Sequence, residues 1–306
     1  MAGALNHKKD ITGEAAMAAI AFIGLGNMGG GMAANLARAG HVVRAFDLSE
    51  AALAAAQEAG CTACTTVAEA VAGAEVVVTM LPNGAIVGQV IENEVIGKAP
   101  AGALLIDCST IDVATARHLA DVAGAAAHPI VDAPVSGGIA AARGGTLTFM
   151  VGGSDDAFAA AQPILTAMGK AVIHAGGAGT GQAAKICNNM LLGATMVATC
   201  ESFRLAERLG LDLQTYYDIA SKASGQSWSM TSYCPVPGVG PQTPADNDYQ
   251  GGFATALMLK DLRLAMGAAL DAGAPVPMGH LAEKLYAAFA ADGHADKDFS
   301  AIIKTL

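Results

Sequence analysis

A turn with three spaced glycines follows an apolar run and is the clearest chemical signal in the sequence. The run covers residues 18–23, and the turn after it reads Gly24, Leu25, Gly26, Asn27, Met28 and Gly29. Gly24 permits a tight turn, Gly26 lets the backbone approach a phosphate, and Gly29 lets a helix pack closely on the strand. The free N–H groups at the start of that helix favour an anion. The pattern predicts a dinucleotide-binding strand, turn and helix.

A carboxylate completes this fingerprint. Asp47 ends the next strand-like run, 42–46, about 20 residues after the glycines, where a carboxylate accepts hydrogen bonds from a ribose diol. With 37 glycines among 306 residues, the glycine motif alone also fits a loose surface turn. Asp47 favours the dinucleotide site and predicts NAD as the cofactor, because its charge repels the 2′-phosphate of NADP.

Polar residues also follow three later strand-like runs. Ser136, Gly137 and Gly138 offer a hydroxyl and successive unobstructed N–H groups, which suit a substrate carboxylate. The other two segments, Leu81-Pro82-Asn83 and Ser109-Thr110, either line the cofactor or are ordinary turns. All three lie where parallel strands end, the edge at which α/β sheets bind ligands.

Lys185 is a further polar residue of interest, because it lies in an apolar stretch. It shares a helix face with Asn189, four residues later, within a strongly apolar stretch. A buried lysine must be paired, neutral or used, and an amine with a lowered pKa can exchange a proton with an alcohol oxygen. The alternative is an ordinary surface lysine whose stem covers apolar neighbours.

Composition limits the classes of function. The net charge is −10 and no basic cluster occurs, which excludes nucleic acid as an expected partner. The most apolar stretch, 183–200, contains Lys185, Asn188 and Asn189, so we expect no membrane span. Six cysteines in a chain of this length predict reduced thiols and a cytoplasmic protein.

Metal binding is not expected. Cys61 and Cys64 form a C-x-x-C motif, which fits a redox pair, half a zinc site, or two cysteines on a short strand and turn. No second C-x-x-C or matching histidine pair completes a metal set, so we favour the strand and turn. No cluster of His, Asp and Glu accompanies the loops named above.

The order of elements predicts an α/β fold followed by an all-α part. Strand-like runs alternate with helical patterns near 84–96, near 112–123 and from residue 154, as in a doubly wound, mainly parallel Rossmann-like sheet. The expected strands are 18–23, 42–46, 75–81, 103–107, 130–135, 146–151 and 171–174. After a Gly-rich connector the β signal disappears. The expected helices there are 182–208, 213–221, 255–272, 276–291 and 299–304.

These patterns divide the chain into three parts. Residues 1–17 are polar and weakly patterned, and are expected to be a flexible N-terminal extension. Residues 18–178 form the expected dinucleotide-binding domain, and 179–306 an all-helical domain for substrate binding and oligomerisation. The long helix 182–208 carries more apolar surface than a small domain can cover, which predicts a homodimer or homotetramer.

Four blocks of this sequence resemble the β-hydroxyacid dehydrogenase family. They are FIGLGNMGGGMAAN at 22–35, DAPVSGGIAAARGGTLTFMVGG at 132–153, GTGQAAKICNNMLL at 179–192 and YQGGFATALMLKDLRLA at 249–265. The similarity runs from residue 18 to the C-terminus. The fourth block, with 224–228 and 233–238 before it, resembles the 3-hydroxyisobutyrate branch in particular. One departure is Gln226, which stands where the similar S-G-R-x-W pattern has arginine.

The resemblance implies a role for each candidate residue. Lys185 matches the catalytic lysine and Asn189 its substrate-positioning partner, while residues 136–138 match the substrate-carboxylate loop. The positions that match cofactor contacts, beside the glycine turn, are Asp47, Leu81, Pro82, Thr110 and Lys260.

The implied reaction is the NAD-dependent oxidation of 3-hydroxyisobutyrate to methylmalonate semialdehyde, in valine degradation. Lys185 would serve as general acid and base. Reduction of tartronate semialdehyde or succinic semialdehyde is the alternative within the family. A non-catalytic NAD-binding sensor is the alternative of another class, although a sensor would need only the glycine fingerprint and not Ser136, Lys185 and Asn189.

Overall fold

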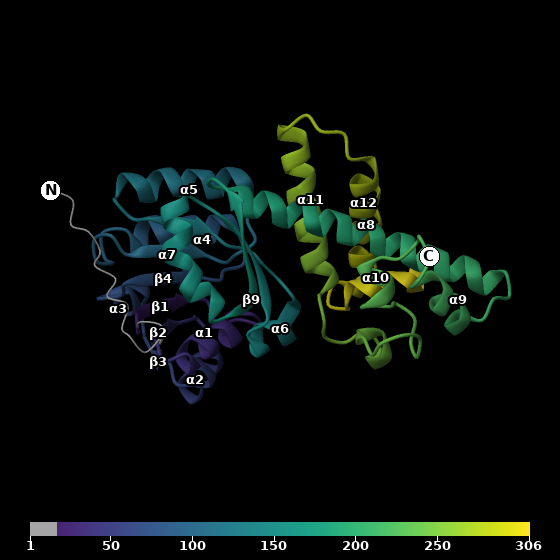
Figure 1. Ribbon diagram of the computed structural model, residues 1–306, viewed down its shortest axis with the longest axis horizontal. Coiled ribbons are helices and arrows are strands. Elements are labelled where there is room, and N and C mark those ends of the chain that lie inside the picture. The colour runs from purple at the N-terminus through teal and green to yellow at the C-terminus, as the bar shows by residue number, and fades with distance from the viewer. Residues whose placement is uncertain (1–16) are drawn as a thin grey trace. The chain divides into compact units, whose positions relative to one another are not determined.

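The computed structural model describes residues 17–306, so the predicted extension lies outside the described residues except for Met17. The chain forms two compact units, which meet in sequence between Gln182 and Ala183. We call them the first and the second unit and describe each by itself (Figure 1).

The described residues of the first unit contain a nine-stranded sheet with the strand order β3-β2-β1-β4-β5-β6-β8-β7, and β9 pairs with β8. Strands β1 to β6 run parallel, which confirms the predicted doubly wound, Rossmann-like class. The strands are β1 (Ala19–Ile23), β2 (Val42–Phe46), β3 (Thr62–Ala63), β4 (Val76–Thr79), β5 (Leu104–Asp107), β6 (Ile130–Asp132), β7 (Val135–Ser136), β8 (Leu147–Gly152) and β9 (Gly169–Gly176).

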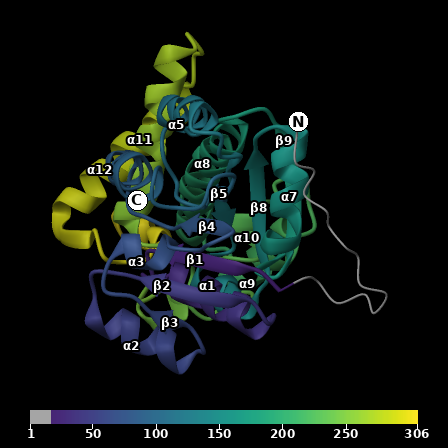
Figure 2. The same ribbon diagram turned by 90° about the vertical axis from the view of Figure 1, so that its left-hand side faces the viewer.

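Helices cover both faces of this sheet. Figure 2 shows α3 and α5 on one side and α7 on the other, and a separate apolar core lies under each layer. The helices are α1 (Gly29–Arg38), α2 (Glu50–Glu58), α3 (Val67–Val71), α4 (Gly84–Val90), the π-helix η1 (Ile91–Val95), α5 (Val113–Ala125), α6 (Gly138–Gly144) and α7 (Asp155–Thr166). A strand buried on both faces is mainly apolar, as in β4, where three valines precede Thr79 and all four residues are buried.

One predicted strand was wrong. The run 130–135 is two strands, β6 and β7, because Pro134 between them has no N–H to donate to a ladder. β7 pairs antiparallel with β8, matching Val135 with Phe149 and Ser136 with Thr148. The break turns the chain so that Ser136 ends a short strand and does not lie in a loop.

The second unit is helical in its described residues. Its core contains buried side chains from α8 to η4, among them Phe203, Tyr286 and Phe299. The elements are α8 (Thr180–Arg208), which begins in the first unit, α9 (Leu213–Ala220), α10 (Trp228–Thr231), the 3-10 helix η2 (Pro244–Asn247), α11 (Thr255–Asp271), α12 (Pro277–Phe289), the π-helix η3 (Ala290–His294) and the 3-10 helix η4 (Phe299–Thr305). No helix in the described part of the chain is long and apolar enough to cross a membrane.

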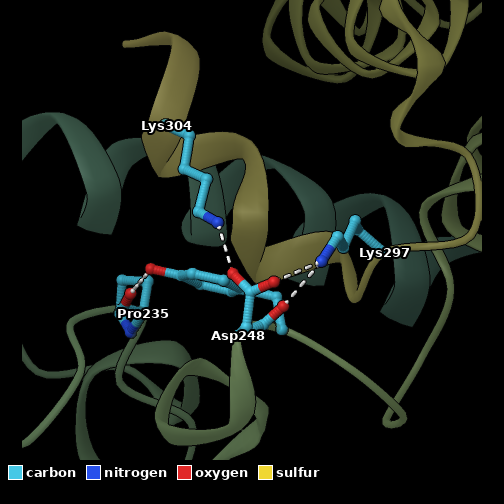
Figure 3. A network of polar contacts seen from close by, with 5 residues as sticks. Pro235, Asp248, Lys297 and Lys304 are labelled. Atoms are coloured by element: carbon cyan, nitrogen blue, oxygen red, sulfur yellow. Dashed lines mark hydrogen bonds and ion pairs between the residues drawn. The ribbon is translucent and has the colours of Figure 1, made fainter.

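An ionic network fixes the segment that precedes α11. Asp248 has a left-handed backbone with φ of 47°, which a non-glycine residue rarely adopts. Figure 3 shows its carboxylate between Lys297 and Lys304, whose Nζ atoms donate hydrogen bonds of 2.7 and 2.8 Å. These two lysines lower the pKa of Asp248 to about 2. The network ties the unusual turn to the C-terminal part of the second unit.

Candidate active site

The three fingerprint glycines have different surroundings. Gly24 has φ of +96°, a conformation that favours glycine, and its N–H donates to Phe46 O at 2.9 Å. A Cβ on Gly29 would collide with the carbonyl oxygen of Gly24 and lie 3.2 Å from the Phe22 ring. A Cβ on Gly26 would meet no atom within 4 Å. Gly26 therefore leaves open space beside the backbone, as the approach of a pyrophosphate requires.

Asp47 lies beside this turn. Its Oδ2 accepts a hydrogen bond of 2.6 Å from the N–H of Leu25, and its Oδ1 accepts one of 2.8 Å from Ser49. The end of β2 is thereby tied to the glycine turn after β1. Within the turn, Asn27 is exposed and Met28 packs against the core at the start of α1. The first unit thus brings the glycine fingerprint and the acidic residue together.

The ends of β4 and β5 are also joined. The N–H of Leu81 donates to Ser109 Oγ at 2.8 Å. Pro82 is exposed, and Thr110 is half-buried directly after Ser109. Two of the segments predicted to line the cofactor are therefore neighbours at the carboxyl edge of the sheet.

Ser136, Gly137 and Gly138 lie between β7 and α6. Ser136 is half-buried at the end of β7, while both glycines are exposed. Gly137 and Gly138 have φ of 137° and 72°. The short helix α6 after them was not predicted, because its sequence of glycines and alanines gives only a weak periodic signal.

Lys185 and Asn189 lie on α8 in the second unit, and both are buried, with 7% and 2% of their surface exposed. Asn189 Nδ2 donates a hydrogen bond of 2.5 Å to Asp261 Oδ2 on α11. The neighbouring Lys260 places its Nζ 3.6 Å from Asp261 Oδ1. The Lys185 amine has no hydrogen bond or ion pair within the described part of the chain.

The surroundings of Lys185 make its amine easier to deprotonate. Burial lowers its pKa, Asp261 opposes that shift, and the positive charge of Lys260 adds to it. A lysine with a lowered pKa loses its own proton at a lower pH, and the neutral amine can then accept one, as a general base must. The arrangement can therefore take a proton from an alcohol and return it to a carbonyl oxygen.

Sequence reasoning missed the buried carboxylates, among them Asp261 and Asp132. Asp261 partners Asn189 from 72 residues away, and Asp132 accepts backbone hydrogen bonds from Gly179 and Gln182 at the start of α8. Burial raises the pKa of Asp132, while those N–H groups oppose the shift. The available signal was an aspartate within a short segment of mainly apolar residues, as in M-L-K-D-L and I-V-D-A-P.

The remaining sequence features have local roles. Gln226 Nε2 donates to Thr231 Oγ1 at 3.3 Å on the surface. Cys61 and Cys64 pack into the two opposite cores of the first unit, so they do not face one another. Within residues 17–306, no group of three His, Cys, Asp or Glu side chains could hold a metal ion.

Two family models match the chain. The model for the NAD-binding domain of 6-phosphogluconate dehydrogenase matches residues 19–177. The model described as the NAD-binding part of NADP-dependent 3-hydroxyisobutyrate dehydrogenase matches residues 179–306.

Curated relatives are similar over nearly the whole chain. A probable 3-hydroxyisobutyrate dehydrogenase of Mycobacterium bovis is 49% identical, over 95% of this chain and 98% of that protein. The 3-hydroxyisobutyrate dehydrogenase of Pseudomonas aeruginosa is 47% identical, over 94% and 98%. The human mitochondrial enzyme is 45% identical, over 94% of this chain and 86% of its own.

Solved structures share the fold. The 3-hydroxyisobutyrate dehydrogenase of Mycobacterium tuberculosis, described with L-serine, has a TM-score of 0.91 at 49% identity, over 95% of this chain and 99% of that one. An imine reductase from a Pseudomonas species has a TM-score of 0.62 at 18% identity, over 94% and 99%, and is similar in fold alone. The matched models and the identities over nearly full length show that the chain belongs to the 3-hydroxyisobutyrate dehydrogenase family of NAD(P)-binding oxidoreductases.

Proposed function

We propose that this protein oxidises 3-hydroxyisobutyrate to methylmalonate semialdehyde, as in valine degradation. The primary alcohol loses a hydride and a proton, and the products are the aldehyde, the reduced cofactor and H⁺. The cofactor supplies the hydride acceptor. The protein binds the substrate carboxylate, orients the alcohol and accepts the proton.

The proposed roles follow from the chemistry of each group. Ser136, Gly137 and Gly138 offer a hydroxyl and exposed backbone for the substrate carboxylate. Neutral Lys185 takes the hydroxyl proton at its Nζ, and Asn189 orients the reacting oxygen. Protonated Lys185 then places positive charge near the oxygen, which favours the reverse reduction.

The proposed cofactor is NAD rather than NADP. The open space at Gly26 and the position of Asp47 beside the same turn fit the pyrophosphate and the adenosine ribose of a dinucleotide. A 2′-phosphate beside Asp47 would be repelled. Lys260, Leu81, Pro82 and Thr110 are the further proposed cofactor contacts.

The buried residue Lys185 carries the proposal. Lys185 is 7% exposed and lacks a hydrogen bond among the described residues, so its burial lowers the stability of the fold. A role in catalysis would explain why a lysine occupies this position. Its neighbours, Asn189 and Asp261, form a defined polar site and not an apolar pocket. A non-catalytic NAD-binding sensor would have no reason to keep these groups.

A panel of small hydroxy acids tests the substrate. NADH formation by the purified protein is measured with 3-hydroxyisobutyrate, glycerate, 4-hydroxybutyrate and L-serine, which has the same HO–CH₂–CH–COO⁻ frame with an amine in place of the methyl. We expect the highest kcat/KM with 3-hydroxyisobutyrate. A higher value with glycerate or 4-hydroxybutyrate would assign the enzyme to tartronate or succinic semialdehyde reduction, and no turnover at all would favour the sensor.

We also propose that the protein acts as a homodimer or homotetramer assembled through its second unit. Large apolar side chains are exposed there, on and after α8 and on α11 and α12. They include Leu191, Leu205, Leu209, Leu270 and Met278. Light scattering at micromolar concentration should give the mass of at least two chains, and a monomer would contradict this proposal.

The proposed location is the bacterial cytoplasm. All six cysteines are free thiols in the described structure, as expected in a reducing compartment. Fractionation of the source cells should recover the activity with cytoplasmic enzymes.

A further inference from the structure

Asp107 is a buried carboxylate at the end of β5 that accepts hydrogen bonds from the neighbouring strand β4 and from Ser109, two residues further along its own segment. It is 3% exposed, and among the described residues a single oxygen, Oδ1, accepts all of its hydrogen bonds. Thr79 Oγ1, at the end of β4, donates at 2.7 Å. Ser109 donates from Oγ at 2.6 Å and from its N–H at 3.2 Å. Asp107 therefore joins the carboxyl ends of β4 and β5.

The connection continues through Ser109. Its Oγ donates to Asp107 and accepts the N–H of Leu81, so three groups form one chain of hydrogen bonds. The Ser109 carbonyl accepts from Gln182 Nε2 at 2.8 Å, and the N–H of Ile111 donates to Gln182 Oε1 at 3.1 Å. Both neighbours of Thr110 are thus held in place.

These held segments lie in the second half of the dinucleotide-binding fold. In the strand order 3-2-1-4-5-6, the first half includes the glycine turn and Asp47, and the second half begins at β4. A dinucleotide that places its adenosine at Asp47 places its nicotinamide over the ends of β4 and β5. Leu81 and Thr110 belong to that side.

We propose that Asp107 is a positioning residue that holds the Leu81 and Ser109–Thr110 segments in the geometry that binds the nicotinamide half of the cofactor. This inference rests on the proposed function, because it assumes that NAD binds the fingerprint. Asp107 itself does not contact the reacting atoms and acts through Ser109.

The surroundings of Asp107 indicate a role beyond folding. Its Oδ2 is buried without a hydrogen-bond partner among residues 17–306. Asp107 and Asp132 both line a cavity of about 10 Å³. Burial raises the pKa of Asp107 to about 6, the hydrogen bonds from Ser109 and Thr79 oppose this, and the charge of Asp132 adds to it. A buried carboxyl group with one oxygen unpaired lowers the stability of the fold. In return, the other oxygen accepts charge-assisted hydrogen bonds from Thr79 and Ser109, which order two segments at once.

A comparison of NAD⁺ binding with ADP-ribose binding distinguishes a positioning role of Asp107 from a general loss of structure. ADP-ribose retains the adenosine and pyrophosphate but lacks nicotinamide. In Asp107→Asn and Ser109→Ala, measured by calorimetry on the purified full chain, we expect the Kd of NAD⁺ to rise about tenfold. The Kd of ADP-ribose should stay within about twofold of the wild-type value. The matched control is Asp112→Ala, which removes the cap of the neighbouring helix α5 without touching the hydrogen bonds of Asp107.

Each outcome decides the matter. An unchanged NAD⁺ Kd in folded Asp107→Asn and Ser109→Ala, or an equal loss for NAD⁺ and ADP-ribose, overturns the positioning role. If Asp107→Asn does not fold, Ser109→Ala decides, because it leaves the carboxylate and its hydrogen bond from Thr79 in place and removes the hydroxyl that joins Asp107 to Leu81. A wild-type protein that binds neither NAD⁺ nor ADP-ribose would contradict the proposed function, and this inference with it.

Discussion

Asn189 donates a hydrogen bond of 2.5 Å from Nδ2 to Oδ2 of Asp261, which lies 72 residues further along the chain. Both side chains are buried, and the other Asp261 oxygen lies 3.6 Å from Lys260 Nζ. The same carboxylate raises the pKa of Lys185 against the larger effect of burial. Asp261 thus orients the proposed substrate-positioning amide and tunes the proposed base.

Removal of the Asp261 charge should shift the pH dependence of oxidation. Asp261→Asn keeps an oxygen that can accept from Asn189 but no longer favours protonated Lys185. The pKa of Lys185 then falls, so the neutral amine forms at lower pH and the rise of kcat/KM with pH moves to lower pH. The control is Arg263→Gln, which removes an exposed charge from the same helix. An unchanged profile in Asp261→Asn, or a shift to higher pH, would disprove this coupling.

Two alanine substitutions should separate the roles of the fingerprint glycines. Gly26→Ala adds a Cβ into open space, so its stability should stay within about 0.5 kcal/mol of wild type. Its NAD⁺ affinity should fall at least about tenfold, because the Cβ takes the place of the pyrophosphate. Gly29→Ala forces a collision with Gly24 and should lose about 1–3 kcal/mol of stability. Urea unfolding and calorimetry check both, and full NAD⁺ affinity in Gly26→Ala would refute the proposed approach of the pyrophosphate.

Asp47 should control the choice between NAD⁺ and NADP⁺. Asp47→Asn keeps one oxygen for the backbone N–H groups but removes the charge that repels a 2′-phosphate. The ratio of kcat/KM for NAD⁺ to that for NADP⁺ should favour NAD⁺ in the wild type and fall by at least about tenfold in the variant. Steady-state rates with each cofactor give the ratio. Comparable efficiency with NADP⁺ in the wild type would contradict the cofactor assignment.

Loss of the Ser136 hydroxyl should weaken substrate binding alone. Ser136→Ala is expected to raise KM for the hydroxy acid about tenfold, and KM for NAD⁺ should stay within about twofold. The control is Thr148→Ser, which changes its register partner on β8 but keeps a hydroxyl. If both KM values rise equally, Ser136 supports the fold and not the substrate.

Much of the first unit could be predicted because its signals are local. Continuous apolar runs mark buried parallel strands, and the glycine turn and Asp47 are fixed within 30 residues of sequence. The split between β6 and β7 was missed although Pro134 marks it, since the apolar pattern continues on both sides. Helix α6 was missed because glycine and alanine give no clear periodicity.

The polar partners could not be predicted because they are far apart in sequence. Asp107 meets Thr79 across 28 residues, and Asp132 meets Gln182 across 50. Lys185 and Asn189 could be paired from the sequence because they share a helix face, whereas Asp261 comes from another helix. Helical spacing reveals residues on one element, but only the folded topology shows which carboxylate they face.

The proposed catalytic site depends on Lys185 as the general base, so substitution of Lys185 tests it most directly. Lys185→Ala and Lys185→Met remove the proposed base. Lys185→Arg keeps the positive charge, but the guanidinium stays protonated at working pH and cannot act as a base. Because burial lowers the pKa of Lys185, wild-type oxidation should rise as the pH increases through that depressed pKa. All three variants should lack this rise.

The measurement is kcat for 3-hydroxyisobutyrate oxidation, with NAD⁺ binding and thermal unfolding determined on the same samples. We expect kcat to fall by about 10²–10⁴ in all three variants while NAD⁺ affinity and folding stay close to wild type. Near-normal turnover in Lys185→Ala, with NAD⁺ bound, would remove Lys185 from the mechanism and contradict the proposed catalytic site.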